Sequence, residues 1–177
     1  MSAKLAGAPK GTRVEDRVDR GFTAFFAEAE PRLRRALVAR LGVERGREAT
    51  AEALAWAFEH WSEVEPMANA VGYLYRVGVS RTRERKAIEP ERAAAATTGS
   101  LPRPGDDVDP ELWAAVSDLS DNQRVAVVLV HAFGWSMKDV AELLEVSVPT
   151  VGTHLRRGLE HLRRRLAETS ELEANDG

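Results

Sequence analysis

The chain has 177 residues, a hydrophobic content of 44%, a formal net charge of −3 and no cysteine. It is long enough to bury one ordinary core or two small ones. Without cysteine there is no disulfide framework, thiolate nucleophile or zinc ribbon, which fits a reducing compartment, and we expect the cytoplasm. Because the whole chain is acidic, a nucleic-acid surface would have to come from locally clustered arginines.

Residues 1–20 are charged, are interrupted by glycine and proline, and lack the continuous apolar stretch of a secretory signal. We interpret them as a disordered tail. The most apolar run, Val125 to Trp135, is about half as long as a membrane span and contains His131. Membrane insertion is therefore not expected.

Residues 21–87 predict a first helical module, with three amphipathic stretches in chain order. Apolar residues recur at helical spacing from Phe22 to Leu41, where Pro31 is expected to break or restart the helix and Gly42 to end it. A second helix is expected over Arg47 to Trp61. A third, from about Ala68 to Lys86, begins aromatic and apolar and ends strongly basic.

The helical pattern stops at residues 88–109, which are rich in alanine, threonine, proline and glycine and are predicted to form a flexible linker. A second module, 110–168, then begins at Pro110 and is followed by a tail, 169–177. Its four expected helices cover Glu111 to Asp118, Asp121 to Ala132, Met137 to Leu144 and Val148 to Ala167. The predicted fold is all-α, with two small helical modules and a helix-turn-helix at the end of the second.

The helix-turn-helix is predicted from five features that occur together: a capped first helix, a small alanine, a three-residue turn, a second cap and a basic second helix. Ser136 and Asp139 have the spacing of a capping box, which starts the first helix. Ala141 is small where a second helix must cross closely. Ser147 can cap the next helix. Pro149 lies in the first turn of that helix, where a backbone amide has no partner within the helix, so its missing N–H costs little.

The second helix of this motif is strongly basic on its outward side. Five arginines and one glutamate lie between positions 156 and 165, a local balance of +4 within an acidic chain. Arginine attracts phosphates and donates in bidentate fashion to guanine edges. The alternative is an ordinary amphipathic helix whose basic face is solvated. That alternative does not explain why the caps, the small alanine and the turn occur together with the basic face, so DNA binding is favoured.

Two stretches, Leu119-Ser-Asp-Asn-Gln-Arg and Gly134-Trp-Ser-Met-Lys-Asp-Val-Ala-Glu-Leu-Leu, resemble region 4 of sigma factors. The resemblance implies recognition of the minus-thirty-five promoter element and contact with the polymerase flap. The implied DNA-binding residues, here called the recognition set, are Ser147, Thr150, Gly152, Thr153, His154, Arg156 and Arg157. The sequence departs from the family at Glu145, where glycine is usual at the turn, and at Gly152, where a basic residue is common.

The run from Thr150 to His154 resembles the helix-turn-helix of two-component response regulators just as closely. A response regulator would carry a receiver domain of alternating strands and helices, and residues 22–86 show no such strands. Instead, Phe22-x-x-Phe-Phe, Pro31-Arg-Leu-Arg-Arg, Glu52-Ala-Leu-Ala-Trp-Ala-Phe-Glu-His-Trp and Gly72-Tyr-Leu-Tyr-Arg-Val resemble region 2 of the extracytoplasmic-function group of sigma factors.

This second resemblance implies two further surfaces. The second helix would bind the polymerase clamp through the polymerase set, Glu48, Glu52 and Trp56. The third helix would open the minus-ten element through the melting set, Tyr73, Arg76, Ser80, Arg81, Arg83, Arg85 and Lys86. Aromatic faces stack on unpaired bases and arginines follow a single-strand backbone. For Tyr73, packing in the core is favoured over contact with DNA. For the arginines, simple exposure to solvent and contact with DNA are equally favoured.

The leading hypothesis is a sigma factor that binds core RNA polymerase and directs promoter-specific initiation, with an anti-sigma factor as a further partner that the family implies. The stretch Glu48 to Ala51 lacks the family's glutamine and two large apolar residues, and Ser80 replaces an asparagine. The alternative is therefore a helix-turn-helix regulator that does not bind polymerase. An enzyme is not favoured and no cofactor is expected, because the histidines lack metal-ligand spacing. His131 is expected to be a hydrogen-bonded core residue.

Overall fold

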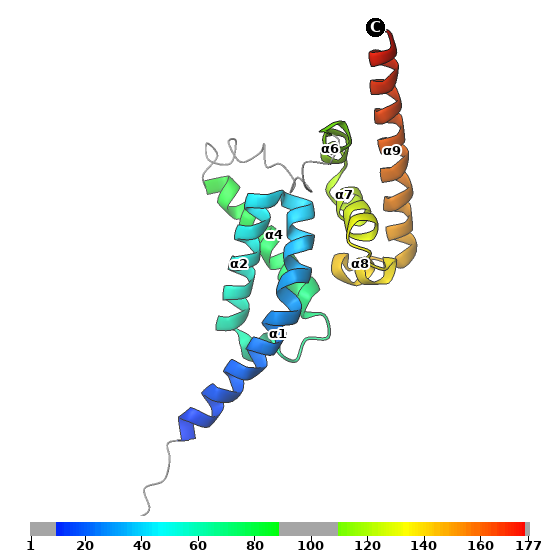
Figure 1. The fold of residues 1–177 in the computed structure, drawn as a ribbon. Helices are drawn as coiled ribbons and strands as arrows, with labels where there is room; N and C mark the ends of the chain where they lie inside the picture. Colours follow the sequence, from blue (N-terminus) through cyan, green and yellow to red (C-terminus); the bar gives the residue numbers. More distant parts are fainter. Residues whose placement is uncertain (1–9, 89–109, 176–177) are drawn as a thin grey trace, which may run out of the picture.

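The computed structural model describes residues 10–88 and 110–175, and every regular element in these two stretches is a helix. The first module contains α1 (Lys10–Leu41), α2 (Val43–Glu59), α3 (Trp61–Val64) and α4 (Ala70–Ile88). The second contains α6 (Pro110–Ser117), α7 (Asp121–Val127), the π-helical turn η1 (Val128–Ala132), α8 (Met137–Leu144) and α9 (Val148–Asn175) (Figure 1). The described part has no helix that is both long and apolar enough to cross a membrane.

The first module is a bundle of α1, α2 and α4. The chain reverses between α1 and α2 at Gly42, whose φ of 83° is a conformation that glycine adopts without strain. The two helices cross so closely that a Cβ on Gly46 would lie 2.5 Å from the Cα of Val38. Leu33 and Leu37 of α1 and Leu74 of α4 are fully buried between the helices. The expected three-helix organisation is confirmed.

Two features of α1 differ from the sequence prediction. The helix begins at Lys10, so the predicted disordered tail is wrong for residues 10–20. Residues 12–20 contain neither glycine nor proline and include three arginines and a glutamate, which are good helix formers, so they can continue a helix already held by packing. The expected break at Pro31 is also wrong, because α1 passes through it. Burial of Ala29 and Leu33, on either side of Pro31, offsets the lost hydrogen bond.

In the second module α6, α7 and α8 pack against the stripe formed by Val151, Leu155 and Leu162 of α9. The helix continues to Asn175, so the tail predicted from residue 169 is helical over most of its length. The π turn η1 ends α7 and carries His131. That histidine is exposed, and its prediction as a core residue is wrong, because η1 points it to solvent.

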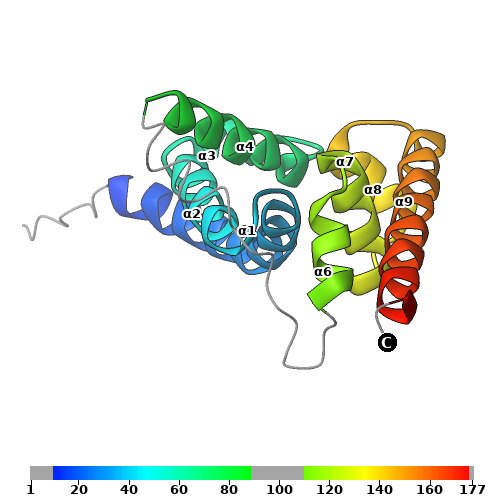
Figure 2. The same ribbon diagram turned by 90° about the horizontal axis from the view of Figure 1, so that it is seen from above.

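The two modules lie side by side. Their buried apolar residues form one continuous cluster, with α1 next to α7 and η1, and α4 next to α8. Seen from above, α7 and α8 lie against the first module and α9 lies on the far side (Figure 2). The all-α, two-module fold is therefore as predicted, and the predicted linker lies outside the described residues except for Ile88, which ends α4.

Candidate nucleic-acid interface

The first helix of the helix-turn-helix, α8, begins at a complete capping box. The amide of Asp139 donates to the hydroxyl of Ser136 over 3.1 Å, and the Ser136 amide and hydroxyl donate back to the Asp139 carboxylate over 3.2 and 2.6 Å. The hydrogen bond from Ser136 holds the pKa of Asp139 below its ordinary value of 3.8. The predicted start of this helix is thus confirmed.

The turn after α8 is left-handed. Glu145 has φ 53° and ψ 46°, and it has the one positive φ among the described non-glycine residues. The amide of Val146 then donates to the carbonyl of Ala141 over 3.0 Å, which closes the turn. A glutamate in this conformation costs about 1 kcal/mol relative to glycine. The departure at Glu145 noted in the sequence is therefore a left-handed, strained turn.

The recognition set lies on the first three turns of α9 and just before them. Ser147 caps the helix, since its hydroxyl accepts from the Thr150 amide over 3.3 Å and pairs with the Thr150 hydroxyl at 2.8 Å. Both Thr150 and His154 are half-buried. The hydroxyls of Ser147 and Thr150 are engaged in hydrogen bonds at the start of the helix. Side chains further along α9 are therefore the ones left to contact DNA.

The outward side of α9 is open. A Cβ on Gly152 would meet no atom within 4 Å, and the Thr153 hydroxyl donates to the carbonyl of Pro149 over 3.1 Å. Arg156 and Arg157 are exposed, and Nη1 of Arg156 lies 2.8 Å from Oε1 of Glu160. The structure thus brings Gly152, Thr153, Arg156 and Arg157 together on one accessible face.

The melting set follows α4, but its members differ in their surroundings. Tyr73 is half-buried and packs on Trp56 with ring centroids 5.4 Å apart. The guanidinium of Arg76 lies 5.6 Å from the Tyr73 ring centroid and forms an ion pair with Glu145 of the second module. Tyr73 therefore has a structural role in the first module, while Arg76 reaches the surface.

The rest of the melting set lies further along α4. Ser80, Arg81 and Arg83 are exposed, whereas the side chains of Arg85 and Lys86 lie outside the described residues. The neighbouring Tyr75 is instead buried, with an exposed fraction of 4%. Burial raises its pKa above 10.0, although Arg40, which donates to its hydroxyl, lowers the pKa in part. Tyr75 is thus a core residue.

The polymerase set lies on α2. Glu48 is exposed and Glu52 is half-buried. Trp56 faces α4, because its ring stacks on His60 at 4.3 Å and packs on Tyr73. The structure therefore leaves Glu48 accessible but engages most of Trp56 in packing.

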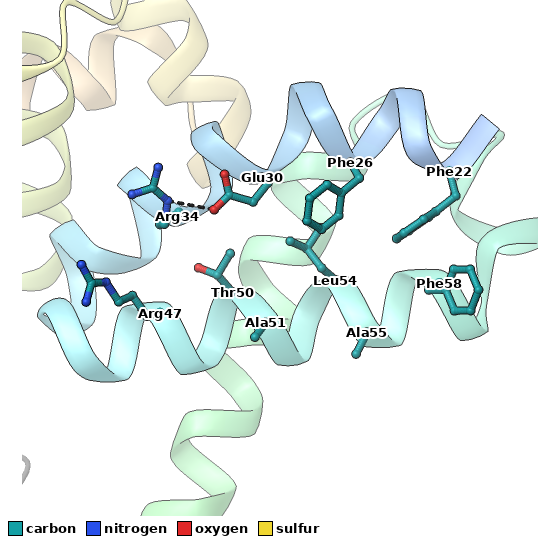
Figure 3. A pocket seen from close by; sticks show the side chains of 10 residues that line it. All are labelled: Phe22, Phe26, Glu30, Arg34, Arg47, Thr50, Ala51, Leu54, Ala55 and Phe58. Atoms are coloured by element: carbon teal, nitrogen blue, oxygen red, sulfur yellow. Dashed lines mark hydrogen bonds and ion pairs between the residues drawn. The ribbon is translucent and has the colours of Figure 1, made fainter. Parts of the chain in front are cut away.

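An apolar groove between α1 and α2 was not predicted from the sequence. Its volume is about 550 Å³, and Figure 3 shows aromatic side chains from both helices toward one end and Arg34 and Arg47 toward the other. The groove includes Phe26 and Phe58, with exposed fractions of 43% and 51%. The lining residues are Phe22, Phe26, Glu30, Arg34, Arg47, Thr50, Ala51, Leu54, Ala55 and Phe58. No sequence signal marks the groove, because the exposure of Phe58 depends on how α1 and α2 cross.

The chain thus consists of two helical modules, the second of which ends in a helix-turn-helix with an open basic face, an arrangement typical of helical DNA-binding proteins. Within the described ranges no cluster of three or more histidine, aspartate and glutamate side chains is arranged to hold a metal ion. Residues 110–162 match the family model described as "Sigma-70, region 4". Comparison with curated proteins finds no match.

The fold of the chain is similar to that of a solved sigma factor. The structure is described as a "Co-crystal structure of the sigma factor RpoE in complex with the anti-sigma factor NepR from Bartonella quintana". The TM-score is 0.61 at 19% sequence identity, over 82% of this chain and 96% of that chain. At this identity the likeness is one of fold. Together, the two comparisons show a segment similar to sigma region 4 within a fold like that of a solved sigma factor.

Proposed function

We propose that this chain binds core RNA polymerase and directs initiation at specific promoters, with its second module on the minus-thirty-five element and its first module opening the minus-ten element. The observation that carries the proposal is the open arginine face of α9 within the region that matches sigma region 4. An α-helix fits the major groove, where Arg156 and Arg157 can contact guanine edges or phosphates.

The exposed part of α4 supports strand opening. Arg76, Arg81 and Arg83 are presented on one helix of the first module and can follow the phosphates of a single strand. Tyr73 is half-buried, so only part of its ring is available for stacking on a base. Arginine contacts with the backbone are therefore the main contribution we assign to this helix.

Polymerase binding is assigned to the exposed side of α2 and the neighbouring groove. Glu48 and Glu52 retain the charge of the polymerase set, and the groove adds the exposed aromatic rings of Phe26 and Phe58. Exposed aromatic residues in a groove are typical anchors of protein interfaces. This apolar area compensates for the large side chains that the stretch from Glu48 to Ala51 lacks.

An anti-sigma factor is proposed as a second partner. The solved protein of similar fold is described in complex with one. In this chain, an anti-sigma factor and polymerase would compete if both used the groove between α1 and α2.

The test is transcription in vitro with purified core polymerase, the purified chain and genomic DNA from the organism that encodes it. We expect start sites that core polymerase alone does not give, and we expect the double variant R156A/R157A to lose them. A chain that co-purifies with polymerase but gives no start site would refute the proposal.

The same purified components test the alternative, a regulator that does not bind polymerase. The changed stretch from Glu48 to Ala51 motivates it. That alternative predicts DNA binding by the chain without co-purification of polymerase. The variant Phe58→Asp, which places a charge in the groove, should abolish co-purification if the assigned polymerase surface is correct.

A further inference from the structure

Thr153 lies at the centre of the outward face of α9. The opposite face is formed by the buried side chains of Val151, Leu155 and Leu162. An α-helix has about 3.6 residues per turn, so Thr153 lies about half a turn round the helix from these three side chains. Pro149 precedes Thr153 by one turn on the same face. Thr153 is therefore in the middle of whatever this face of α9 contacts.

The hydroxyl of Thr153 is already used within the helix. Its Oγ1 donates to the carbonyl of Pro149, one turn back, over 3.1 Å. A hydroxyl has one hydrogen, so this bond uses the only donor of the side chain. The bond also turns the oxygen toward the backbone of α9. The γ-methyl group is therefore the part of Thr153 that is left to face a ligand.

The neighbouring residues add little polar character to this part of the face. Pro149 is exposed and has no amide hydrogen to donate. The hydroxyls of Ser147 and Thr150 lie 2.8 Å apart and bond to each other. Gly152 has no side chain, and His154 is half-buried about 100° round the helix from Thr153. The first two turns of α9 thus present mainly carbon at the centre of the outward face.

The major groove of DNA has one apolar feature that such a surface can match. Adenine, guanine and cytosine present hydrogen-bond donors and acceptors there, whereas thymine adds a C5-methyl group. A carbon surface placed against a donor or acceptor would leave that polar group without a partner, which is unfavourable. The same surface placed against a methyl group removes apolar area from water. The composition of the face therefore favours thymine.

We propose that Thr153 is a specificity-determining residue, whose methyl group packs with the Pro149 ring on the C5-methyl group of a thymine in the major groove. This inference rests on the proposed function, because it names the base that this part of α9 recognises. Arg156 and Arg157, about one turn further along the helix, contact the guanine edges or phosphates beside that thymine.

The test uses a duplex that the purified full chain selects from a pool with a randomised central segment. Each thymine of this duplex is replaced in turn by deoxyuridine, which lacks the C5-methyl group and keeps the same hydrogen-bonding groups. Fluorescence anisotropy measures the affinity for each duplex. One replacement should lower the affinity about fourfold, the factor that corresponds to burial of one methylene-sized group. Replacements outside the contacted segment should have no effect.

Two substitutions separate the methyl group of Thr153 from its hydroxyl. Thr153→Ser keeps the hydroxyl and its bond to Pro149 but removes the methyl group. Its affinity for the thymine duplex should fall about fourfold, and deoxyuridine at the sensitive position should cause no further loss. Thr153→Val keeps a methyl group and removes the hydroxyl, so it should retain the preference for thymine. Serine, threonine and valine have similar helix propensities, so both variants should fold.

Thr82→Ser is the matched control. The Thr82 hydroxyl donates to the carbonyl of Gly78, also one turn back, over 2.8 Å, but it lies on α4 of the first module. This variant should distinguish thymine from deoxyuridine as the wild type does. Arg157→Ala provides a second control, because it should weaken binding to both duplexes by the same factor.

Equal affinity for the thymine duplex and for every deoxyuridine duplex would overturn the inference, while the selected sequence would still support DNA recognition. A preference for thymine that persists in Thr153→Ser and is lost in Thr153→Val would also overturn it, because the hydroxyl would then contact the base. Loss of the preference in Thr82→Ser would place the effect outside α9. A chain that selects no sequence, alone or with core polymerase, would refute the proposed function together with the inference.

Discussion

The recognition set makes a quantitative prediction about salt dependence. Each phosphate contact that a basic residue makes contributes about −0.9 to the slope of log K against log salt. Arg157 is exposed, and no ion pair among the described residues neutralises it, whereas Arg156 shares its charge with Glu160 at 2.8 Å. Arg157→Ala should therefore flatten the slope by about 0.9 if it contacts phosphate, and Arg156→Ala should flatten it less. A bidentate contact with guanine would add about 1–3 kcal/mol of discrimination.

The assay is fluorescence anisotropy with a duplex that carries a promoter identified by the transcription experiment, over a series of salt concentrations. Arg47→Ala is the control, since this exposed arginine lies on α2 of the other module. Glu160→Gln should act in the opposite direction, because it releases Arg156 and removes a negative charge that faces DNA.

An unchanged salt slope in R156A/R157A would refute the assignment of this face of α9 to DNA. A uniform loss of affinity across all sequences, with a flatter slope, would assign both arginines to phosphates. Loss of discrimination at one base pair would assign one of them to a base edge.

Three further predictions follow from the packing and the caps. Gly46→Ala should lower the free energy of unfolding by about 1–3 kcal/mol, because its Cβ would lie 2.5 Å from the Val38 Cα. Gly152→Ala has open space around it and should raise the free energy of unfolding by about 0.5–1 kcal/mol. Denaturant unfolding measures both changes. Gly152→Arg should tighten DNA binding and steepen the salt slope by about 0.9, as anisotropy would show, and a clash with DNA would weaken it instead. Asp139 has a depressed folded pKa, so its stabilisation is present above the ordinary value of 3.8 and is lost as the pH falls below it. Thermal melts of Asp139→Asn should lack this part of the acid sensitivity.

The helix-turn-helix could be predicted from sequence almost residue by residue. The expected range of α8, Met137 to Leu144, is the observed one, and the capping box at Ser136 is present. These features depend on hydrogen bonds between residues three or four positions apart, which leave a local signature. The apolar stripe of α9 is likewise set by its own periodicity.

Features that depend on distant residues could not be predicted in the same way. Arg124 binds the backbone carbonyls of Ala39 and Arg40, and any residue type supplies a carbonyl, so the sequence carries no sign of the contact. The groove between α1 and α2 requires the crossing geometry of two helices. The continuity of α1 through Pro31 depends on burial on both sides, which overrides a local preference.

Glu145 carries the last prediction, because two small energies oppose each other there. Its left-handed backbone costs about 1 kcal/mol relative to glycine, and an ion pair between half-exposed side chains contributes about 0.2–1 kcal/mol. Glu145→Gly loses both the strain and the ion pair with Arg76, so the free energy of unfolding should change by less than about 1 kcal/mol.

The same variant should nevertheless bind single-stranded DNA more tightly, because Arg76 is uncovered. Denaturant unfolding and oligonucleotide binding on one sample separate the two effects. A large gain in stability without a gain in binding would mean that Glu145 strains the turn without masking anything. Unchanged stability with tighter binding would show that Glu145 covers Arg76 at little net cost to the stability of the fold.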